Sequence, residues 1–338
     1  MPKRLHVSPA FTKALPAYLG GKRQLAPLIT ALIGEQRPRP AWGGLRLHDA
    51  FAGGCAFALH AKAMGFDVTA SDVASRSVVT ARALVENSNV RLSTADVLDL
   101  FGDAPPDAPS MALDFVGSTF TTPQARFIDH ALARARLRTE PTRSLLTLVI
   151  IKTVLRMQPM SVLNATDAAA AIRGDLDHVS SRRLGHYLKA DRLLVPATVQ
   201  QIADDVNAGV IGGRGAGRQG DALTTIPDVR ADVLYLDPPY PSTTGYIDVY
   251  GPLDQILGDI ANMTPPPTLD ALFDAARDVP LVVLSYGGPR VTLDGLVAIV
   301  GRHRPVLRAL AIPYPHLRSL ATKEKNRENR EYLVVAGR

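Results

Sequence analysis

The sequence of 338 residues contains a single cysteine, Cys55, and few aromatic residues (6%). One cysteine can form neither an internal disulfide nor a zinc cluster of several thiolates, which favours a reducing compartment such as the cytoplasm. Long apolar runs are also missing: the longest, residues 145–151, contains Thr147 and is much shorter than the roughly 20 residues of a membrane-spanning helix. We therefore expect a cytoplasmic protein that does not cross a membrane.

Patterns of metal ligands are absent as well. The eight histidines show no paired spacing with cysteine or with carboxylates, so no bound metal is predicted. What is present is the composition of a folded globular protein, with 46% hydrophobic and 21% charged residues. The length allows one large α/β domain with an inserted module, or two modest domains.

The formal net charge of +6 is distributed unevenly along the chain. Residues 126–218 contain 14 basic and 8 acidic side chains, and residues 302–338 contain 9 and 3. Between these two basic segments, residues 219–301 contain 3 basic and 11 acidic side chains. Two basic segments in one chain favour a polyanionic partner, and nucleic acid is the first candidate.

The first third of the chain predicts alternating strands and helices. Residues 46–51 are predicted as a strand, and the glycines after it open an alanine-rich helix that ends at Met64. A second strand over residues 67–71 leads into a helix over residues 74–87. This β-α-β-α order is typical of an α/β sheet domain.

The remaining elements are predicted from the same hydrophobic patterns. Four more strands are expected over residues 231–237, 281–286, 306–314 and 331–335. Before them, helices are expected over residues 123–138, 144–156 and 195–208.

These patterns divide the chain into three predicted parts. Residues 1–114 form the first half of a sheet domain, residues 115–220 a helical insertion, and residues 221–338 the second half. The insertion ends in the glycine-rich segment 212–220, whose two arginines and lack of an apolar anchor predict a mobile basic loop.

The segment Asp237-Pro238-Pro239-Tyr240 directly follows a predicted buried strand. Ligands bind at the carboxyl ends of strands in open α/β sheets, and the two prolines hold Asp237 and Tyr240 in a rigid arrangement. Such a set suits a planar amine, because the carboxylate and the Pro238 carbonyl accept both amino hydrogens while the tyrosine ring stacks on the heterocycle. The segment is the candidate catalytic centre.

A tight glycine turn follows the first predicted strand. The stretch from Asp49 through Phe51 to Gly53 and Gly54 allows the backbone to approach a ligand closely. Asp72, at the end of the second strand, is placed to accept hydrogen bonds from ribose hydroxyls. Together with the catalytic segment, this turn predicts a nucleoside-binding crevice.

With a third motif, Tyr18-Leu19-Gly20-Gly21-Lys22, these segments resemble the D12-class DNA adenine-N6 methyltransferases. The order of the motifs resembles the family's α arrangement, in which the cofactor motifs precede target recognition and the catalytic motif follows. The residues after the catalytic segment continue the likeness with Pro241, Thr243, Tyr246, Tyr250 and Leu253-Asp254. Softer likenesses cover residues 122–129, 187–189, 285–288 and 330–333.

The resemblance implies a Rossmann-like, class I S-adenosylmethionine-dependent methyltransferase sheet with a helical target-recognition insertion. S-adenosylmethionine is the implied cofactor, and the implied partners are double-stranded DNA and a cognate restriction endonuclease. Beyond the glycine turn and Asp72, the implied cofactor-binding residues are Tyr18, Gly21, Lys22 and Asp237. Asp221, just before the catalytic strand, is favoured as the acidic residue that touches the cofactor adenine, with Asp96 as its rival.

The sequence departs from the family pattern at Cys55, where the glycine turn usually has another glycine. A cysteine is accommodated there if its φ is negative, and its bulk near the methionine moiety is expected to weaken cofactor binding. Methylation of an exocyclic amine needs no covalent intermediate, so we interpret Cys55 as a packed small residue and not as a nucleophile.

The implied reaction is methyl transfer from S-adenosylmethionine to N6 of an adenine that is flipped out of the duplex. Acceptors on Asp237 and Pro238 would free the lone pair of the amine for in-line attack, while the base stacks on Tyr240. Tyr246 and Tyr250 are candidates for the mouth of the same pocket.

Two groups of basic residues are expected to bind DNA. In the helical insertion, where arginine can read guanine edges as well as phosphates, the candidates are Arg182, Arg183 and Lys189. In the C-terminal segment, the candidate phosphate contacts are Lys323, Lys325, Arg327 and Arg330.

Other activities fit the same residues. Methylation of adenine in RNA or of the cytosine N4 amine in DNA is an alternative, although the long insertion and the motif order favour adenine in DNA. A DNA-binding regulator with a methyltransferase fold and no turnover is a further alternative, because Cys55 departs from the cofactor motif.

Overall fold

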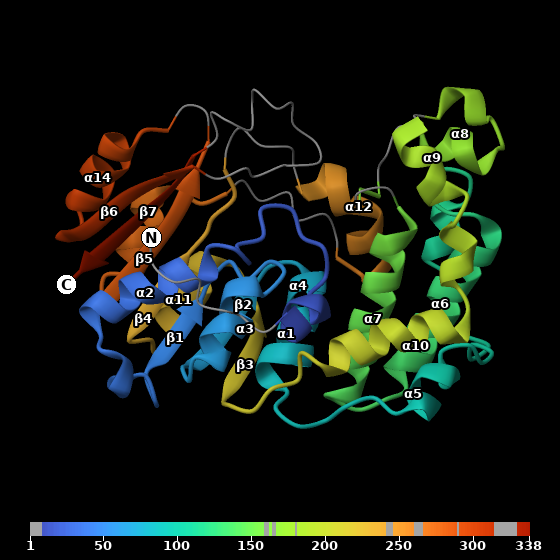
Figure 1. The fold of residues 1–338 in the computed structure, drawn as a ribbon, viewed down its shortest axis with the longest axis horizontal. Coiled ribbons are helices and arrows are strands. Elements are labelled where there is room, and N and C mark those ends of the chain that lie inside the picture. The colour runs from blue at the N-terminus through green and yellow to red at the C-terminus, as the bar shows by residue number, and fades with distance from the viewer. Residues whose placement is uncertain are drawn as a thin grey trace.

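The computed structural model describes residues 9–158, 162–163, 167–179, 181–240, 246–259, 266–288, 291–313 and 330–338. Its centre is a seven-stranded sheet with the order β3-β2-β1-β4-β5-β7-β6 (Figure 1). Only β7 runs against its neighbours, β5 and β6, and the other pairs are parallel. The strands are β1 Arg46–Asp49, β2 Asp67–Asp72, β3 Gly215–Gln219, β4 Val233–Leu236, β5 Leu281–Gly287, β6 Val306–Pro313 and β7 Arg330–Gly337.

The helices form two groups. Before residue 90 and after residue 220, the helices are α1 Pro9–Ala14, α2 Ala26–Gln36, α3 Ala56–Ala63, α4 Ser75–Thr80 with a π-helical turn over 81–86, α11 Ala222–Asp228, α12 Tyr246–Ile256, α13 Leu269–Ala275 and α14 Leu293–Gly301. The others gather at one side of the sheet (Figure 1): α5 Thr94–Asp99, α6 Thr122–Arg136, α7 Thr142–Met157, α8 Ala168–Ile172, α9 Ser181–Tyr187 and α10 Pro196–Asn207.

Local signals explain the helical part. Helix α6 begins at a capping box, in which Thr121 and Gln124 satisfy each other's backbone N–H groups, and Pro123 stands in its first turn. Helix α7 is apolar on nearly all sides, and it packs against α6, α10 and α4. A helix that is buried all round belongs to a core, so α7 joins the helical part to the sheet part.

The glycine-rich segment 212–220 is not a loop, because residues 215–219 form the edge strand β3 beside β2. The prediction was wrong because it took an absence of apolar side chains for an absence of structure. At Gly215 an added Cβ would lie 2.3 Å from the Val85 carbonyl oxygen, and at Gly217 it would lie 3.0 Å from the Arg82 nitrogen. The glycines let the π-helical turn pack directly on the strand, where larger residues would not fit.

Apolar side chains cover both faces of the sheet. The larger core includes residues of α2, α3, α7, α10 and α12, and the smaller one lies beneath α11, α13 and α14. This arrangement confirms the predicted Rossmann-like α/β class. No helix in the described ranges is long and apolar enough to span a bilayer. The boundaries between sheet domain and insertion stay predictions, with β3 already part of the sheet.

Candidate active site

Three carboxylates lie at the carboxyl ends of neighbouring strands. Asp49 ends β1, Asp72 ends β2, and Asp237 directly follows β4. Burial raises the pKa of Asp49 well above its usual range, and the charge of Asp237 raises it further. Burial also raises the pKa of Asp72. The three carboxyl groups thus lie at one edge of the sheet, where burial disfavours their charged forms and a cationic ligand would favour them.

Lys22 is the cation closest to Asp237. Its Nζ lies 2.8 Å from Asp237 Oδ1, and its side chain is only 4% exposed. Burial raises the pKa of Asp237 to about 6, against the lowering effect of the Lys22 charge. Within the described residues, Asp237 Oδ2 has no hydrogen-bond partner, so one oxygen of the carboxylate is held and the other can accept a ligand hydrogen.

Glu331, on β7, completes this group. The Lys22 Nζ lies 3.5 Å from Glu331 Oε1, and the Tyr240 hydroxyl donates to the same oxygen at 2.8 Å. Ser285 also donates to Glu331, whose side chain is fully buried. We call Lys22, Asp237, Tyr240, Ser285 and Glu331 the Lys22 network. It fixes the hydroxyl end of Tyr240, whose ring lies against that of Tyr286 at 5.1 Å between centroids.

Sequence reasoning did not assign Glu331 to the site. The available signal was a glutamate at the start of the strand-like run 331–335, because a carboxylate is almost never fully buried without a partner.

The N-terminal motif packs on the glycine turn. An added Cβ at Gly53 would lie 2.7 Å from Tyr18 Cε1, and one at Gly54 would lie 2.8 Å from Tyr18 Cβ. Asp72 accepts hydrogen bonds from the backbone N–H groups of Gly53, at 2.8 Å, and Ala74, at 2.9 Å. The structure thus brings together the predicted residues of all three motifs, and the glycines make room for the Tyr18 ring.

A second cation, Arg76 on α4, organises the other end of the N-terminal motif. Its guanidinium pairs with Asp254 and lies 4.5 Å from the centre of the Tyr250 ring, which stacks on Tyr18. The Tyr250 hydroxyl accepts a hydrogen bond from the Leu19 N–H at 2.7 Å. We call Arg76, Asp254, Tyr250, Tyr18 and Leu19 the Arg76 network. Tyr250 is therefore a buried packing residue, not an exposed lining of the pocket mouth.

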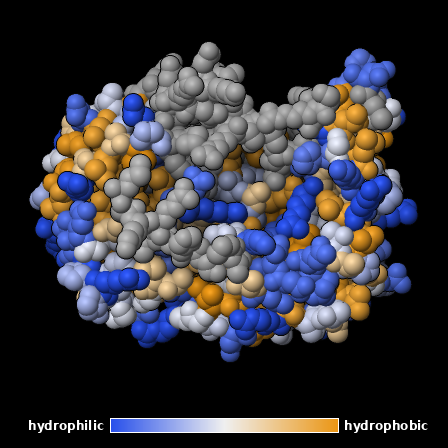
Figure 2. Space-filling model, viewed as in Figure 1, coloured by the Kyte–Doolittle hydropathy of each residue, from blue (hydrophilic) through white to orange (hydrophobic). Residues whose placement is uncertain are grey.

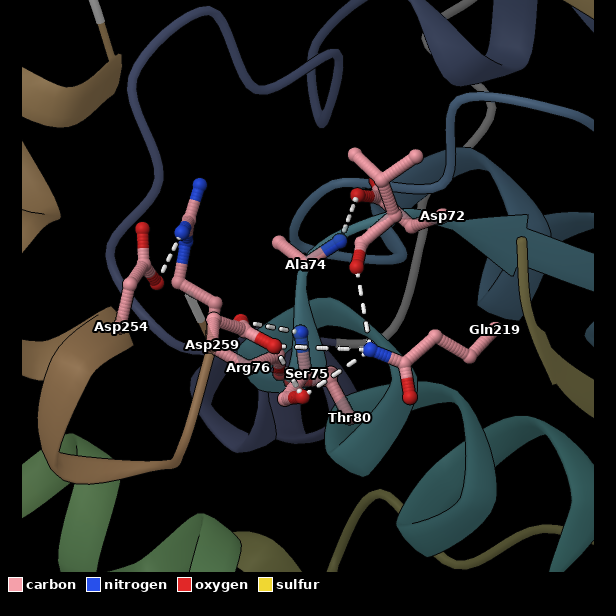
Figure 3. Close-up of polar contacts among 9 residues, drawn as sticks. Asp72, Ala74, Ser75, Arg76, Thr80, Gln219, Asp254 and Asp259 are labelled. Carbon is pink, nitrogen blue, oxygen red and sulfur yellow. Dashed lines mark hydrogen bonds and ion pairs between the residues drawn. The ribbon is translucent and has the colours of Figure 1, made fainter. Parts of the chain in front are cut away.

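Hydrogen bonds also join the segment after the catalytic motif to Ser75, the first residue of α4 (Figure 3). Asp259 accepts hydrogen bonds from the Ser75 N–H, at 2.7 Å, and from the Ser75 hydroxyl. Gln219, at the end of β3, donates to Ser75 Oγ at 3.1 Å and to Asp259 at 3.5 Å. The close-up shows these contacts beside Asp72, so α12 is anchored next to the predicted ribose-binding residue.

Cys55 has a left-handed backbone, with φ 56°, and is fully buried. The condition of a negative φ is therefore not met: this position keeps the left-handed conformation that favours glycine. The Sγ lies 3.6 Å from the Ser77 carbonyl oxygen, and burial raises the pKa of the thiol well above its usual range. A buried thiol with a raised pKa is unreactive, in keeping with a packing role.

Several remaining predicted residues have local roles. Asp221 caps α11 by accepting from the Leu223 N–H at 2.8 Å, and its rival Asp96 forms a capping box with Ser93 at the start of α5. Gly21 donates its N–H to the Tyr18 carbonyl at 3.3 Å, and Phe51 is half-buried against the smaller core.

The predicted DNA-binding residues are only partly described. Arg183 pairs with Asp167 at 3.0 Å, and Tyr187 donates to the same carboxylate. Lys189 is exposed after α9. The side chains of Arg182 and Tyr246 lie outside the described residues, as do Lys323, Lys325 and Arg327. In the described part of the chain, no three His, Cys, Asp or Glu side chains form a group that could hold a metal ion.

The strand order and the residues at the ends of β1, β2 and β4 define a Rossmann-like methyltransferase. Residues 18–254 match the family described as D12 class N6 adenine-specific DNA methyltransferase, and the chain belongs to this family. It is also 24% identical over 333 residues to the type II methyltransferase M2.HphI of Haemophilus parahaemolyticus. The alignment covers 94% of this chain and 96% of that relative. The predicted family and its DNA adenine-N6 methyltransferase activity are confirmed, and the family implies a methyl donor.

Proposed function

We propose that Asp237, Pro238, Pro239 and Tyr240 form the centre at which this chain methylates N6 of a flipped-out adenine in duplex DNA. The observation that carries the proposal is the asymmetry of Asp237: Lys22 holds Oδ1 at 2.8 Å, while Oδ2 has no partner among the described residues. A carboxylate held in this way accepts an amino hydrogen without reorganising.

The cofactor we propose is S-adenosylmethionine, which supplies a methyl group bound to a cationic sulfonium. The Asp49 Oδ1 atom fits such a ligand, because it is buried and has no hydrogen-bond partner in the described structure. An unpartnered buried acceptor is costly, and a bound cationic or donor group removes that cost. Asp72 faces the same crevice from β2, where we propose that it binds the ribose, and the glycines 53 and 54 let the backbone lie close to the ligand.

The chain's own residues then act on the amine. The Asp237 carboxylate and the Pro238 carbonyl accept one hydrogen each, which draws the nitrogen lone pair out of conjugation with the adenine ring. Stacking on Tyr240 holds the base in place, and the bond from the Tyr240 hydroxyl to Glu331 fixes the ring. The proton that the methylated amine loses can pass to Asp237, whose pKa burial raises to about 6.

Further proposals concern the residues that contact DNA, the partner protein and the location in the cell. We propose that Arg183 and Lys189 of the helical part contact DNA, together with the C-terminal lysines 323 and 325 and Arg327. Because the relative from Haemophilus parahaemolyticus is named a type II methyltransferase, we propose a cognate restriction endonuclease as a functional partner. Duplex DNA and the methyl donor meet in the cytoplasm, where we place the protein.

The test is to incubate the protein with S-adenosylmethionine that carries a labelled methyl group and, separately, with unmethylated DNA and RNA. Each product is then digested and its labelled nucleoside is identified. We expect N6-methyldeoxyadenosine from DNA, and no label when Asp237→Ala replaces the wild type as a control for a contaminating enzyme. Label in N4-methyldeoxycytidine or in RNA would overturn the substrate, and cofactor binding without any label would favour the non-catalytic regulator.

A further inference from the structure

A pocket outside the Lys22 and Arg76 networks opens where the sheet part meets the helical part. It has a volume of about 450 Å³ and lies between the chain segment after α1 and the helices α7 and α10. We call it the junction pocket, and its charged lining residues are Lys13, Arg23, Lys152, Arg156 and Asp205. None of these residues has a role in the proposed methyl transfer.

The junction pocket carries an excess of positive charge. Among the lining residues that the structure describes, Asp205 is the one acidic side chain, and it pairs with Arg156 at 3.1 Å. In the described ranges, no carboxylate lies within ion-pair distance of Lys13, Arg23 or Lys152. Cations collected in one cavity repel each other, and a bound anion is the simplest way to offset that repulsion.

Lys152 is tied into the fold by hydrogen bonds to the backbone. Its side chain is 4% exposed, and its Nζ donates to the carbonyl of Ala14 at 2.7 Å and to that of Lys13. Arg23 donates to the carbonyls of Leu15, at 3.0 Å, and Pro16. Burial lowers the pKa of Lys152 to about 7, as expected for an ammonium that lacks a carboxylate partner. Both side chains therefore form hydrogen bonds to the backbone of residues 13–16, which precede the Tyr18–Lys22 motif.

We propose that the junction pocket binds a phosphate group of the DNA backbone, an inference that rests on the proposed function. Among the described residues of the lining, none has an aromatic side chain on which a base could stack, so the chemistry selects the phosphate and not the nucleobase. Its position also fits, because the pocket lies between the sheet part and the helical part, and Figure 2 shows strongly hydrophilic side chains on the surface of both parts. A phosphate bound in the pocket would stabilise the position of residues 13–16. DNA binding would thereby stabilise the position of the adjacent Tyr18–Lys22 motif as well.

The test uses the double variant Lys13→Ala/Arg156→Ala, which removes two exposed cations and leaves Lys152 and Arg23 to hold the backbone. The matched control is Arg277→Ala/Arg338→Ala, which removes two exposed arginines beside Asp278. Affinity for a short duplex is measured over a series of salt concentrations. We expect the slope of log affinity against log salt to become shallower by about 2 in the test variant, and to stay unchanged in the control.

A second measurement separates the two sources of a phosphate group. Inorganic pyrophosphate is titrated into the wild type and the double variant by calorimetry. Pyrophosphate binding by the wild type alone, with equal salt slopes for DNA, would overturn the DNA assignment in favour of a free anion. Equal slopes without pyrophosphate binding would overturn the pocket altogether. Failure of the wild type to bind any DNA would contradict the proposed function instead, so the two failures are distinguishable.

Discussion

The two networks at the ends of the N-terminal motif differ in what their cations hold. Lys22 lies between two carboxylates and the Tyr240 hydroxyl, and one of those carboxylates, Asp237, belongs to the proposed catalytic centre. Arg76 instead pairs with Asp254 and packs against the rings of Tyr250 and Tyr18. Both cations are nearly inaccessible to solvent.

The two networks therefore have different roles, one in the proposed reaction and the other in stabilising the fold. The Lys22 network sets the charge and orientation of groups that we place next to the reacting amine. The Arg76 network ties α12 and the N-terminal motif to α4. Breaking the first should therefore change the rate and its pH dependence, whereas breaking the second should change stability and cofactor binding.

The largest effect is expected for Lys22→Met. Loss of the ammonium leaves Asp237 without the cation that orients it and favours its charged form, and we expect kcat/KM for methyl transfer to fall by about 10²- to 10³-fold. Because Lys22 lowers the pKa of Asp237, the acid limb of the pH profile should move to higher pH. Unchanged kcat/KM in single-turnover and steady-state assays would contradict the proposed role of Lys22.

Arg76→Met is expected to lower the stability of the fold. It leaves Asp254 buried without its partner, and we expect the free energy of unfolding to fall by about 3 kcal/mol. Chemical denaturation measures this loss. The double variant Arg76→Met/Asp254→Asn removes the orphaned charge and should recover part of it. An Arg76→Met protein with wild-type stability but a displaced pH profile would mean that the two networks are not separate.

The wild-type pH profile should report Asp237. Because this carboxylate must be ionised to accept the amino hydrogen, and its pKa is about 6, we expect kcat/KM to be about tenfold lower at pH 5 than on the plateau. The loss cannot come from this group's effect on folding: its pKa is raised in the folded state, so acidification through pH 6 adds stability. Denaturation curves at both pH values provide the control, and a flat rate profile down to pH 5 would contradict the assignment.

Glu331→Gln should give a smaller effect of the opposite sign on the pH profile. The amide keeps an acceptor for Tyr240 and Ser285, so we expect a loss in kcat of about tenfold or less. The charge of Glu331 raises the pKa of Asp237, so its removal should move the acid limb to lower pH, opposite to the shift in Lys22→Met. Two shifts in the same direction would show that Glu331 acts only through structure.

The sequence could predict the parts of this site that depend on local chain geometry. The ends of β1, β2 and β4 were placed because a glycine turn, an aspartate or a pair of prolines follows each strand directly. The partners of those residues could not be derived in the same way. Arg76 meets Asp254, and Lys22 meets Glu331, only after the sheet has brought distant segments together.

The strand β3 was missed for a related reason. Its glycines carry no hydrophobic period, and their purpose is visible only when Val85 and Arg82 of the neighbouring turn lie against them. Cys55 is a similar case, since a residue type that disfavours positive φ is held there by the surrounding turn and helix.

The smallest effect is expected at Cys55, in the turn on which the Tyr18 end of the Arg76 network rests. Cys55→Ala keeps the left-handed backbone strain and loses the packing of Sγ, so we expect it to lower the free energy of unfolding by about 1 kcal/mol. Cys55→Gly loses the same packing but relieves the strain, and should be more stable than Cys55→Ala, the reverse of the usual order for these residues. Denaturation of the three proteins gives the order, and calorimetry with S-adenosylmethionine should show the tightest binding for Cys55→Gly. Neither substitution should move the acid limb of the pH profile that Asp237 sets, and a shift would mean that the turn affects the Lys22 network. An alanine variant at least as stable as the glycine variant would mean that the φ of 56° has no energetic cost.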